Sequence, residues 1–581
     1  MSGKEKRPFF SYREFMLKRY GESLHRIPID LAFNCPNREV NGSGGCSFCP
    51  PHAARARQTF EKNSVAEQIG SAIQFAKKRY TSQKFLAFFQ TFSAQFQAHQ
   101  LPQYMDVLKS APFEAVCFAT RPDCLIEEAY SFFIDLQKQK EVWVELGVQT
   151  VKNSTLERIN RRHTWEQSAV AIRKLNQIGI KVVPHVIIGL PGEGEKDFYA
   201  TAKTLASLPI SGIKIHNLHI IKGALLEKEF EQEAFPVFNE FEYGEFLMQF
   251  LRYLPPQIPI LRINTDTPAS DRLAPIWKMD KSRFRHYVVE QMKYRNWHQG
   301  DFVSPGKKHI PDKVFKAVVT KDGSLTFYNK EFNCHYHPQT GARRFVEDNF
   351  LQPSQLTKKA GHRKIRILDI GFGPGYCSLL ALNRAVTNGS EVEIFALERD
   401  MRVVTAASRK LLPHPEDKYS FSQALTELLQ KNYFGIRNSF INILWGEARF
   451  TIDRLDGKFD LVFLHTFPFY KNCELLTLEF FVKIKKLLNP AATFMLSARD
   501  LPVRNGLFEA GFYVAEIGAL HAGGSGTIAV LTEQSMAKPI IPENMGQLKG
   551  VRGNVYRDPD SIMTVKEILR AREMANNAAH L

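Results

Sequence analysis

The sequence predicts an α/β protein with two domains, a partial TIM-like (β/α)6 barrel followed by a Rossmann-like domain. In the first half, six apolar or β-rich runs alternate with amphipathic stretches, a pattern that is typical of parallel βαβ units. Near residue 365 an apolar run leads into a glycine-rich turn and a helical stretch, as at the start of a nucleotide-binding fold. The chain has 581 residues, which is more than one hydrophobic core usually supports.

Composition and charge narrow the classes of protein. The chain is 44% hydrophobic and carries 77 Lys and Arg against 60 Asp and Glu, a formal net charge of +17. This surplus favours a polyanionic partner such as RNA, although a basic surface can also serve solubility alone. No apolar run is long enough to cross a membrane and the start of the chain lacks a secretory signal, so we expect no membrane partner. Eight cysteines are too few for a disulfide framework in so long a chain, which favours the cytoplasm.

Changes in composition place the domain boundaries. Residues 303–315 gather Pro, Gly and Lys between two periodic segments, which is typical of a linker. The barrel domain then covers 1–302 and the second domain covers 316–535. Residues 536–581 form a C-terminal extension of the second domain, Pro-rich at first and helical from 561 to 576.

The first half contains six predicted strands with helices between them. Amphipathic stretches at 64–79 and 165–178 follow two of these strands, as the crossover helices of a barrel do. The predicted strands are 29–33, 85–92, 114–120, 142–150, 181–189 and 212–221.

Polar residues and one glycine gather toward the carboxyl ends of the predicted strands, where barrels of this kind carry their chemistry. Each residue also has a plain structural interpretation; Glu145, for example, could instead be a buried ion-pair partner. The candidates for binding a cofactor on this rim are Gln90, Arg121, Asp123, Glu145, Gln149 and Gly189.

Three cysteines follow the first predicted strand. Ten residues separate Cys35 from Cys46, and two separate Cys46 from Cys49. Each iron of a [4Fe–4S] cluster takes one cysteine, so three thiolates leave the fourth iron open to an external ligand. An open iron beside S-adenosylmethionine (SAM) is what radical chemistry requires, because the reduced cluster can cleave the sulfonium. The same cysteines could instead form part of a zinc site with His52, or a redox pair.

Residues 8–302 resemble a radical SAM family of the YhcC/YtqA type, whose SAM core is similar to that of the catalytic subunit of elongator. The resemblance implies that Cys35, Cys46 and Cys49 bind the cluster and that residues on the rim hold SAM and substrate. No acetyltransferase domain of the elongator kind is apparent in the sequence, so an acetyl-CoA reaction is not expected. The matching stretches are 32–38, 120–125, 142–150, 185–193 and 212–216.

The second half contains a glycine-rich turn that suits a nucleotide-type cofactor. An apolar run that includes Asp369 leads into Gly371, Gly373 and Gly375. Glycines at such a turn let the backbone approach a ligand closely, and the helix that follows presents its N-terminus to the ligand. The acid before the glycines and the Gly-x-Gly-x-Gly spacing favour SAM over NAD.

Two acidic residues of the second half are candidates for contacting that cofactor. A predicted strand at 391–397 leads directly to Glu398. A carboxylate at this position can accept hydrogen bonds from both ribose hydroxyls. Glu447 could lie against the adenine amino group. The next predicted strand, 459–464, points into the same site.

Over about 320–575 this half resembles methyltransferases of the MnmC/MnmD type and their archaeal relatives, which methylate the aminomethyl group on the wobble uridine of tRNA. The family usually carries an aspartate at the position of His465, and that acid is thought to contact the substrate amine. A histidine there could act as a base, or it could reflect a changed substrate or a weakened activity. His465 and Lys471 are the candidate catalytic residues. The matching stretches are 326–342, 467–472, 524–529 and 556–559.

Together these features predict a bifunctional tRNA-modifying enzyme with a [4Fe–4S] cluster in the barrel and one SAM in each domain. An external electron donor of the flavodoxin or ferredoxin type would reduce the cluster, and the barrel would functionalise C5, or a C5 substituent, of wobble uridine 34. The second domain would then methylate an amine on the same base. Two alternatives stay open: a protein or small metabolite as the substrate, and a degenerate second domain that only binds RNA.

Overall fold

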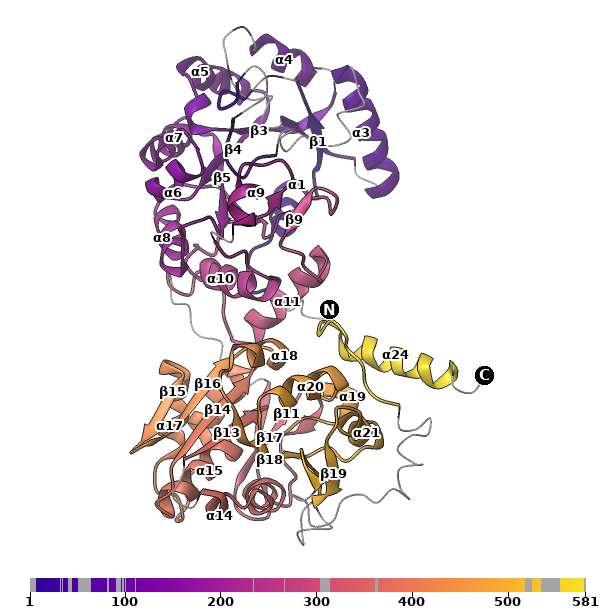
Figure 1. Cartoon of the computed structure of the whole chain (residues 1–581). Helices are drawn as coiled ribbons and strands as arrows, with labels where there is room; N and C mark the ends of the chain where they lie inside the picture. Colours follow the sequence, from indigo (N-terminus) through magenta and orange to yellow (C-terminus); the bar gives the residue numbers. More distant parts are fainter. Residues whose placement is uncertain are drawn as a thin grey trace. The chain divides into compact units, whose positions relative to one another are not determined.

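The structure is a computed structural model that divides into two compact units (Figure 1). Unit 1 consists of Met1–Lys293 and Trp297–Lys307, and unit 2 of Tyr294–Asn296 and Lys308–Leu581. The domain boundaries given by the sequence stay predictions. The structure describes residues 7–31, 33, 35–39, 44–50, 64–80, 83–89, 96, 99, 101–109, 111–232, 235–265, 267–303, 314–360, 364–517, 525–533 and 554–578.

Unit 1 is built on a seven-stranded parallel sheet whose first six strands lie side by side in chain order (Figure 1). Parallel neighbours in chain order, joined by helical crossovers, form the partial barrel that the sequence predicts. A short seventh strand, not predicted from the sequence, pairs with the sixth. The strands are β1 (His25–Ile29), β2 (Phe85–Phe89), β3 (Phe113–Thr120), β4 (Glu141–Gln149), β5 (Lys181–Ile188), β6 (Ile213–Asn217) and β8 (Ile260–Arg262).

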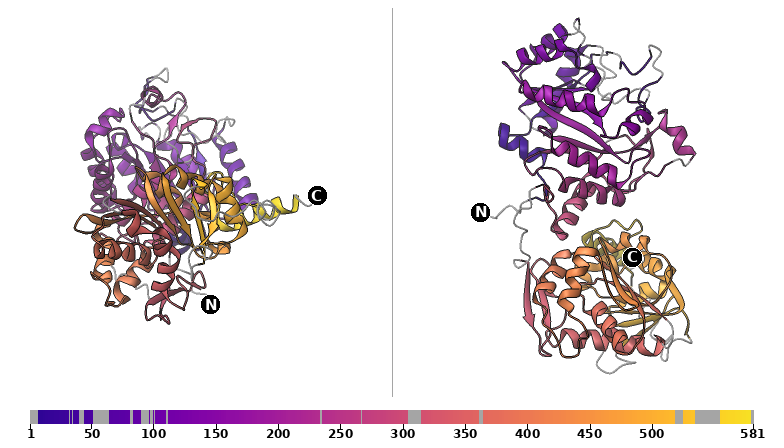
Figure 2. Two further views of the ribbon diagram at one scale, coloured as in Figure 1. Left: turned by 60° about the horizontal axis from the view of Figure 1, so that its bottom comes forward. Right: turned by 90° about the vertical axis from the view of Figure 1, so that its left-hand side faces the viewer.

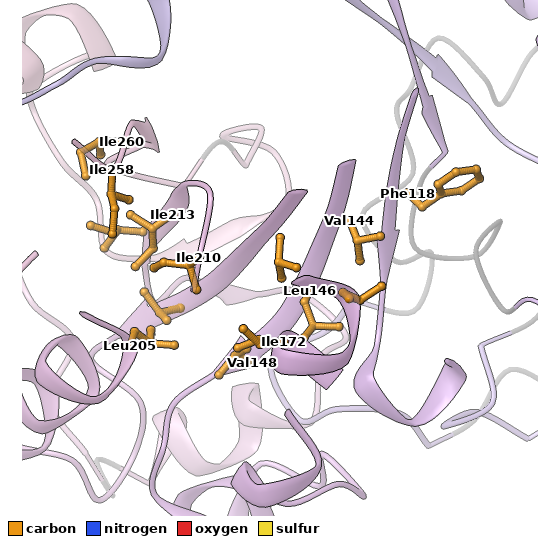
Figure 3. Packing of buried hydrophobic residues seen from close by; sticks show 14 of the residues in the cluster. Phe118, Val144, Leu146, Val148, Ile172, Leu205, Ile210, Ile213, Ile258 and Ile260 are labelled. Carbon is orange, nitrogen blue, oxygen red and sulfur yellow. The ribbon is translucent and has the colours of Figure 1, made fainter. Parts of the chain in front are cut away.

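One face of this sheet packs against the crossover helices. Successive residues of a strand point to opposite faces, and Val144, Leu146 and Val148 of β4 all belong to the large hydrophobic cluster on this face (Figure 3). Ile172 from a crossover helix belongs to the same cluster. The helices that contribute to it include α3 (Val65–Tyr80), α4 (Leu101–Lys109), α5 (Glu127–Leu136), α7 (Trp165–Gln177), α8 (Glu195–Ala206) and α10 (Glu240–Arg252).

The opposite face, which forms the barrel interior, is covered in part by the N-terminal helix α1 (Tyr12–Tyr20). Met16 of this helix packs in one cluster with Cys117 of β3 and Trp143 of β4. Because Glu145 follows Trp143 by two residues, its side chain points into the same interior. The interior of the barrel is therefore apolar near α1 and polar farther along the strands.

Two predicted strands of unit 1 differ from the observed ones. The strand predicted at 29–33 is observed as β1, which ends at Ile29; the Asp30 N–H then donates to the Gln68 side chain, and the Asp30 carbonyl accepts from it. The strand predicted at 212–221 is divided into β6 and β7 (Ile220–Ile221), and β7 pairs with β9 (Arg272–Ala274) instead of continuing the main sheet.

Unit 2 contains an eight-stranded mixed sheet of the Rossmann type, as predicted. Its five parallel strands are arranged β16-β14-β13-β17-β18, so the order of the strands reverses between β13 and β17. Ligands of open α/β sheets bind at the carboxyl ends of the strands that flank such a reversal. The strands are β13 (Ile365–Ile370), β14 (Val392–Glu398), β15 (Tyr433–Ile436), β16 (Ser439–Trp445), β17 (Phe459–Leu464), β18 (Leu488–Leu496), β19 (Tyr513–Glu516) and β20 (Thr527–Val530).

Helices cover both faces of this sheet (Figure 2). Apolar residues of α15 (Tyr376–Thr387), α16 (Met401–Lys410) and α17 (Phe421–Lys431) belong to the cluster on one face, and those of α20 (Leu478–Lys486) and α21 (Leu501–Glu509) to the cluster on the other. Parallel strands that are buried on both faces are nearly continuous apolar runs, which is why β13 and β17 were easily predicted from the sequence.

Two further segments complete unit 2. A small antiparallel sheet of β10 (Phe315–Val319), β11 (Leu325–Asn329) and β12 (Cys334–His335) precedes the Rossmann-type sheet. The C-terminal helix predicted at 561–576 is α24 (Val565–Ala578). None of the helices in the described parts of the chain is long and apolar enough to cross a membrane.

Candidate active sites

The cysteine loop of unit 1 follows β1 and is held by its own backbone. Arg38 N–H donates to the Cys35 carbonyl and Cys49 N–H to the Cys46 carbonyl, each at 2.9 Å. The Arg38 guanidinium donates to the carbonyl oxygens of Cys49 (3.2 Å) and Pro50 (2.6 Å). All three cysteines are free thiols.

Three nitrogen donors converge on the Cys46 sulfur. They are Arg161 Nη1 at 3.2 Å, Asn37 Nδ2 at 3.3 Å and Arg121 Nη1 at 3.6 Å. Burial by itself raises the pKa of the Cys46 thiol, but the two guanidinium charges and these hydrogen bonds outweigh it, and the pKa is lowered. The surroundings of Cys46 therefore favour a thiolate, which is the form that binds metals.

The donor set fits a [4Fe–4S] cluster better than a single metal ion. The pKa of Cys49 is raised by burial and also by the thiolates of Cys46 and Cys35, so the three thiols lie within electrostatic reach of one another. Yet among the residues that the structure describes, no group of three His, Cys, Asp or Glu side chains is close enough to hold one ion. A cluster binds each thiolate at a different iron and does not need convergence on one point. His52, the fourth ligand of the zinc alternative, lies outside the described residues.

Among the rim residues predicted from the sequence, Arg121 contacts the cysteine loop directly, through the Cys46 sulfur. Arg121 is buried, donates to both carboxylate oxygens of Asp123 at 2.9 and 2.8 Å, and donates to the Arg161 carbonyl at 2.7 Å. Gln149 ends β4 with φ of 70° and is buried, a strained backbone of the kind that is concentrated at functional sites. Gln90 lies outside the described residues.

The turn after β5 places a glycine and an acid next to this rim. Gly189 has φ of 100°, and a Cβ there would lie 3.2 Å from the ring of Phe238, so the turn requires glycine. The Thr150 hydroxyl donates to the Glu193 carboxylate at 2.5 Å. Burial raises the pKa of Glu193 to about 7. A carboxyl that titrates near neutral pH at a strand end is a candidate for contact with a charged cofactor.

Glu145 lies deeper than its neighbours, inside the barrel. Its carboxylate accepts from Arg26 Nη1 at 2.7 Å, from His185 Nε2 at 3.0 Å and from the Lys214 ammonium, and the residue is 1% exposed. This is the buried ion-pair partner named above as the alternative. Because both oxygens are already occupied by cationic or imidazole nitrogens, the structure gives no support to Glu145 as a cofactor ligand.

The groups around Glu145 are strongly perturbed. Burial by itself would raise the pKa of Glu145, but the charges of Arg26 and Lys214 outweigh it and hold the pKa well below its usual range. Burial and the neighbouring Arg26 lower the pKa of Lys214 to about 7, and burial and Lys214 lower that of His185 to about 4. At neutral pH the interior therefore holds a carboxylate, a permanent guanidinium and a neutral imidazole.

In unit 2 the glycine-rich turn follows β13 at the strand-order reversal. Gly371, Gly373 and Gly375 all have positive φ, at 81°, 55° and 96°. A Cβ on Gly371 would overlap the backbone carbonyl oxygen of His465. Asp369 is fully buried beneath the turn, where Ser378 Oγ donates to it at 2.5 Å and burial raises the pKa of its carboxyl to about 7. Asp369 thus links β13 to the helix that follows the turn through its hydrogen bond with Ser378.

Glu398 ends β14, contacts the turn directly and lines a pocket beside it. Its carboxylate accepts from the backbone N–H groups of Gly373 at 2.7 Å and Asp400 at 2.8 Å, and burial raises its pKa to about 7. Glu447 lines the same pocket and accepts from Arg399 at 3.3 Å and Arg449 at 3.4 Å. Burial raises the pKa of Glu447, but these two arginines outweigh it and lower the pKa.

Aromatic and imidazole rings form the rest of the pocket wall. Phe332 and Phe467 are stacked with centroids 4.8 Å apart, and the Tyr336 ring is tilted by 59° to the same Phe467 ring at 4.8 Å. His465 lies 4.8 Å from the ring of His337, and burial lowers the pKa of His465 to about 4. All but His337 line the pocket.

The structure gives Lys471 a local partner. Its ammonium donates to the backbone carbonyl of Phe332, a residue of the turn between β11 and β12. Lys471 therefore ties the loop after β17 to that turn and fixes one of the two stacked rings. His465 lines the pocket, whereas Lys471 contacts the backbone of a lining residue, Phe332.

Comparisons with known proteins find related domains in both halves of the chain. Family models of the radical SAM superfamily and of the radical SAM C-terminal domain match residues 34–205 and 210–294. A family model of the S-adenosyl-L-methionine-dependent methyltransferases matches residues 415–521. Fold and sites together define a radical SAM enzyme that carries a methyltransferase domain; the first implies a [4Fe–4S] cluster and SAM, and the second implies SAM.

Protein YhcC of Escherichia coli strain K12 is 31% identical over 300 residues, which are 51% of this chain and 95% of YhcC. The chain belongs to the YhcC family. A tRNA uridine(34) acetyltransferase of Methanocaldococcus jannaschii is 30% identical over 159 residues, 27% of this chain and 29% of that protein. The crystal structure of MnmC2 from Aquifex aeolicus has 27% identity and a TM-score of 0.40, and covers 52% of this chain and 93% of that one.

Sequence reasoning missed two residues of the cysteine site. Arg161 follows α6 (Asn153–Arg158) rather than a strand, so a search of strand ends could not find it. Asn37 is two residues from Cys35, and its place beside the cysteine could have suggested a role. No local pattern marks Arg161 as a partner of Cys46, because their contact joins segments 115 residues apart.

Proposed function

We propose that this chain is a bifunctional tRNA-modifying enzyme that acts on the wobble uridine. The barrel functionalises C5 or a C5 substituent of that base, and the second domain methylates an amine on the same substituent. The observation that carries the proposal is the presence of a radical SAM barrel and a SAM-dependent methyltransferase domain in one chain. A relative of the barrel segment is named tRNA uridine(34) acetyltransferase, and the second half resembles methyltransferases that act on the same base.

In unit 1 the residues of the cysteine loop would hold the cluster. Cys35, Cys46 and Cys49 supply the thiolates, and SAM lies on the rim formed by Arg121, Asp123, Gln149 and Gly189, with Gln90 as a further candidate. When bound, the cluster supplies an electron, received from a flavodoxin or ferredoxin type donor, that cleaves the sulfonium of SAM. The chain itself buries Cys46 among Arg121, Arg161 and Asn37, whereas Cys35 and Cys49 are half-buried.

In unit 2 different pocket residues would contact different parts of SAM. At the turn of Gly371, Gly373 and Gly375 the protein backbone can approach SAM closely. Glu398 accepts hydrogen bonds from the ribose hydroxyls, and Glu447 lies toward the adenine. SAM supplies an electrophilic methyl group, so the chain has mainly to place the substrate amine in line with the sulfonium.

The pocket wall suits an unstacked base whose substituent carries an amine. Phe332 and Phe467 offer flat rings on which a splayed uridine can stack. Because burial lowers its pKa to about 4, His465 is a neutral imidazole at pH 7 and can accept a hydrogen bond from the substrate amine. The formal net charge of +17 would hold the tRNA backbone.

The function is tested by mass spectrometry of tRNA nucleosides from cells that lack the gene. We expect the wobble-uridine modification to be lost, and to return on complementation with the intact gene. Complementation with Cys46→Ser should leave the base without the product of the radical step. Complementation with Gly371→Ala should leave that product unmethylated. Unchanged wobble uridines in the deletion strain would contradict the tRNA assignment.

The alternative functions give different results. A protein or small-metabolite substrate predicts no salt-dependent tRNA binding in a gel-shift assay, whereas a tRNA substrate predicts binding that weakens steeply with salt. A degenerate second domain that only binds RNA predicts no SAM binding at Glu398. We also propose a cytoplasmic location and domain boundaries at 302, 316 and 535. Limited proteolysis tests the boundaries, with cleavage expected between 303 and 315.

We expect SAM binding to unit 2 to depend on pH through Glu398. The ionised carboxylate accepts the ribose hydroxyls better than the neutral acid does, and its pKa is raised to about 7 by burial. Affinity should therefore fall as pH drops, by about tenfold between pH 8 and pH 6, because the ionised fraction falls from about 90% to about 10%. Calorimetric titration of a chain with Cys35, Cys46 and Cys49 replaced by alanine isolates this site. Glu398→Gln should bind more weakly and show no such pH dependence; an equal dependence in that variant would refute the assignment.

A further inference from the structure

The loop that follows α6 is bound to the cysteine loop at several points. Ser47 N–H donates to the Ile159 carbonyl at 2.9 Å, and the Asn160 side chain donates to the Gly45 carbonyl at 2.7 Å. In return the Asn37 amide donates to the Asn160 carbonyl at 2.7 Å as well as to the Cys46 sulfur. The next residue of this loop, Arg161, is therefore held in a fixed position relative to Cys46.

The Arg161 guanidinium spans two acceptors. Nη1 donates to Cys46 Sγ at 3.2 Å and Nη2 donates to the Gly147 carbonyl at 2.7 Å. The side chain is buried, with 5% of the residue exposed. In the parts of the chain that the structure describes, Arg161 has no carboxylate within ion-pair distance, and its Nε has no hydrogen-bond partner.

Burying a guanidinium without a counter-charge is costly, so a negative charge is required next to Arg161. Asp123 does not supply it, because it is occupied by both nitrogens of the Arg121 fork. The acceptor that faces the Arg161 side chain is the Cys46 sulfur. As a ligand of an iron–sulfur cluster, that sulfur belongs to an anionic group whose negative charge increases on reduction.

We propose that Arg161 is a positioning residue that sets the reduction potential of the cluster through the sulfur of Cys46. Hydrogen bonds to cluster sulfurs and nearby positive charge stabilise the reduced form and raise the potential. Arg121 contributes less, because its charge is balanced by Asp123 and its contact with the sulfur is longer, at 3.6 Å. The inference rests on the proposed role of Cys46 as a cluster ligand.

The same geometry explains the glycine at position 147. A Cβ on Gly147 would overlap Arg161 Nη2 and lie 2.9 Å from Gln149 Nε2. Any side chain at this position would push the guanidinium away from its two acceptors. Gly147→Ala should therefore reproduce part of the effect of replacing Arg161, although the arginine itself is retained.

The test is an anaerobic redox titration of the full-length protein, reconstituted with iron and sulfide and followed by electron paramagnetic resonance without SAM. Arg161→Lys keeps the charge but cannot span both acceptors, and Arg161→Gln removes the charge. We expect the midpoint potential to become more negative in the order wild type, Arg161→Lys, Arg161→Gln, with Gly147→Ala also below wild type. Arg162 is the matched control: it is the adjacent arginine, with an exposed side chain, and Arg162→Gln should leave the midpoint and the spectrum unchanged.

The possible outcomes separate this inference from the proposed function. A wild-type protein that binds no iron would refute the cysteine site, and with it the basis of the inference. Normal iron content with equal midpoints in wild type, Arg161→Lys and Arg161→Gln would refute the role of Arg161 alone. Loss of iron from both Arg161 variants would also refute it, since Arg161 would then be required for assembly and not for tuning. An equal shift in Arg162→Gln would show a general charge effect and would overturn the role of the hydrogen bond.

Discussion

Replacing Glu145 with alanine should destabilise unit 1 by about 3–5 kcal/mol, the usual cost of removing one partner from a buried ion pair. The carboxylate is 1% exposed and contacts Arg26, Lys214 and His185 from three other strands. Without it, Lys214 can lose its proton, since its pKa is already lowered to about 7. Arg26 cannot lose its charge, so most of the destabilisation comes from an unpaired guanidinium inside the barrel.

Glu141 is the matched control for this prediction. It lies on the same strand and pairs with Arg19 at 2.7 Å and Lys181 at 2.9 Å, but its own side chain is 16% exposed, against 0% for that of Glu145. Glu141→Ala should therefore cost less than Glu145→Ala, about 1–2 kcal/mol, of which part comes from the lost hydrogen bond of Trp143 Nε1 at 3.0 Å. Adding Arg26→Met to Glu145→Ala should recover much of the lost stability, because the unpaired charge is then removed.

Denaturant unfolding followed by tryptophan fluorescence measures these changes, because four of the five tryptophans lie in unit 1. A Glu145→Ala variant that loses no more stability than Glu141→Ala would show that the buried network does not hold the strands together. A double variant less stable than Glu145→Ala would show that Arg26 contributes mainly through packing. The four residues are Trp143, Trp165, Trp277 and Trp297.

Replacing Gly371 with alanine should weaken SAM binding to unit 2 on the order of 100-fold or more, about 2.8 kcal/mol. The added Cβ would overlap the backbone carbonyl oxygen of His465, and a backbone atom cannot rotate away as a side chain does. His465 N–H is in turn bonded to the Ile370 carbonyl at 3.1 Å, so the clash is transmitted to the strand that carries the turn. The cofactor turn and the pocket wall at His465 would be displaced together.

Gly323 separates the clash from the strain of a positive φ. Both glycines have φ of 81°, but a Cβ on Gly323 would meet nothing within 4 Å. Each alanine variant should lose about 1–2 kcal/mol of stability from the left-handed backbone, while only Gly371→Ala should lose SAM binding. Calorimetric titration of the chain without the three loop cysteines gives the affinities. Equal SAM affinity in the two variants would contradict the placement of the cofactor against this turn.

The features that the sequence predicted are local in the chain. The glycines after β13 and Glu398 at the end of β14 are adjacent to apolar runs that end at the same edge of the sheet. Parallel pairing then brings them together without further information, and Gly373 N–H does contact Glu398. The order of helices and strands follows in the same way from periodic patterns.

The features that the sequence did not predict depend on how deep a residue lies in the barrel and on contacts between segments that are far apart in the sequence. Glu145 resembles a rim residue in the sequence, but four further residues of β4 separate it from the end of the strand, which places it in the interior. Arg26 and Lys214 reach it from strands that are 119 and 69 residues away. No local pattern records which charged residues will share the inside of a barrel, and the same is true of Arg161 and Cys46.

The order of the strands has a consequence for synthesis on the ribosome. In unit 1 each new strand pairs with the one made just before it, and the sheet is complete once Arg262 has emerged. In unit 2 the last strand that the structure describes, β20, inserts between β18 and β19, so that sheet cannot close before Val530 is available. Domains fold as units during translation, N-terminal first. We therefore expect nascent chains released at about residue 310 to hold a folded, protease-resistant barrel, while chains that end before 527 keep an open sheet edge in unit 2.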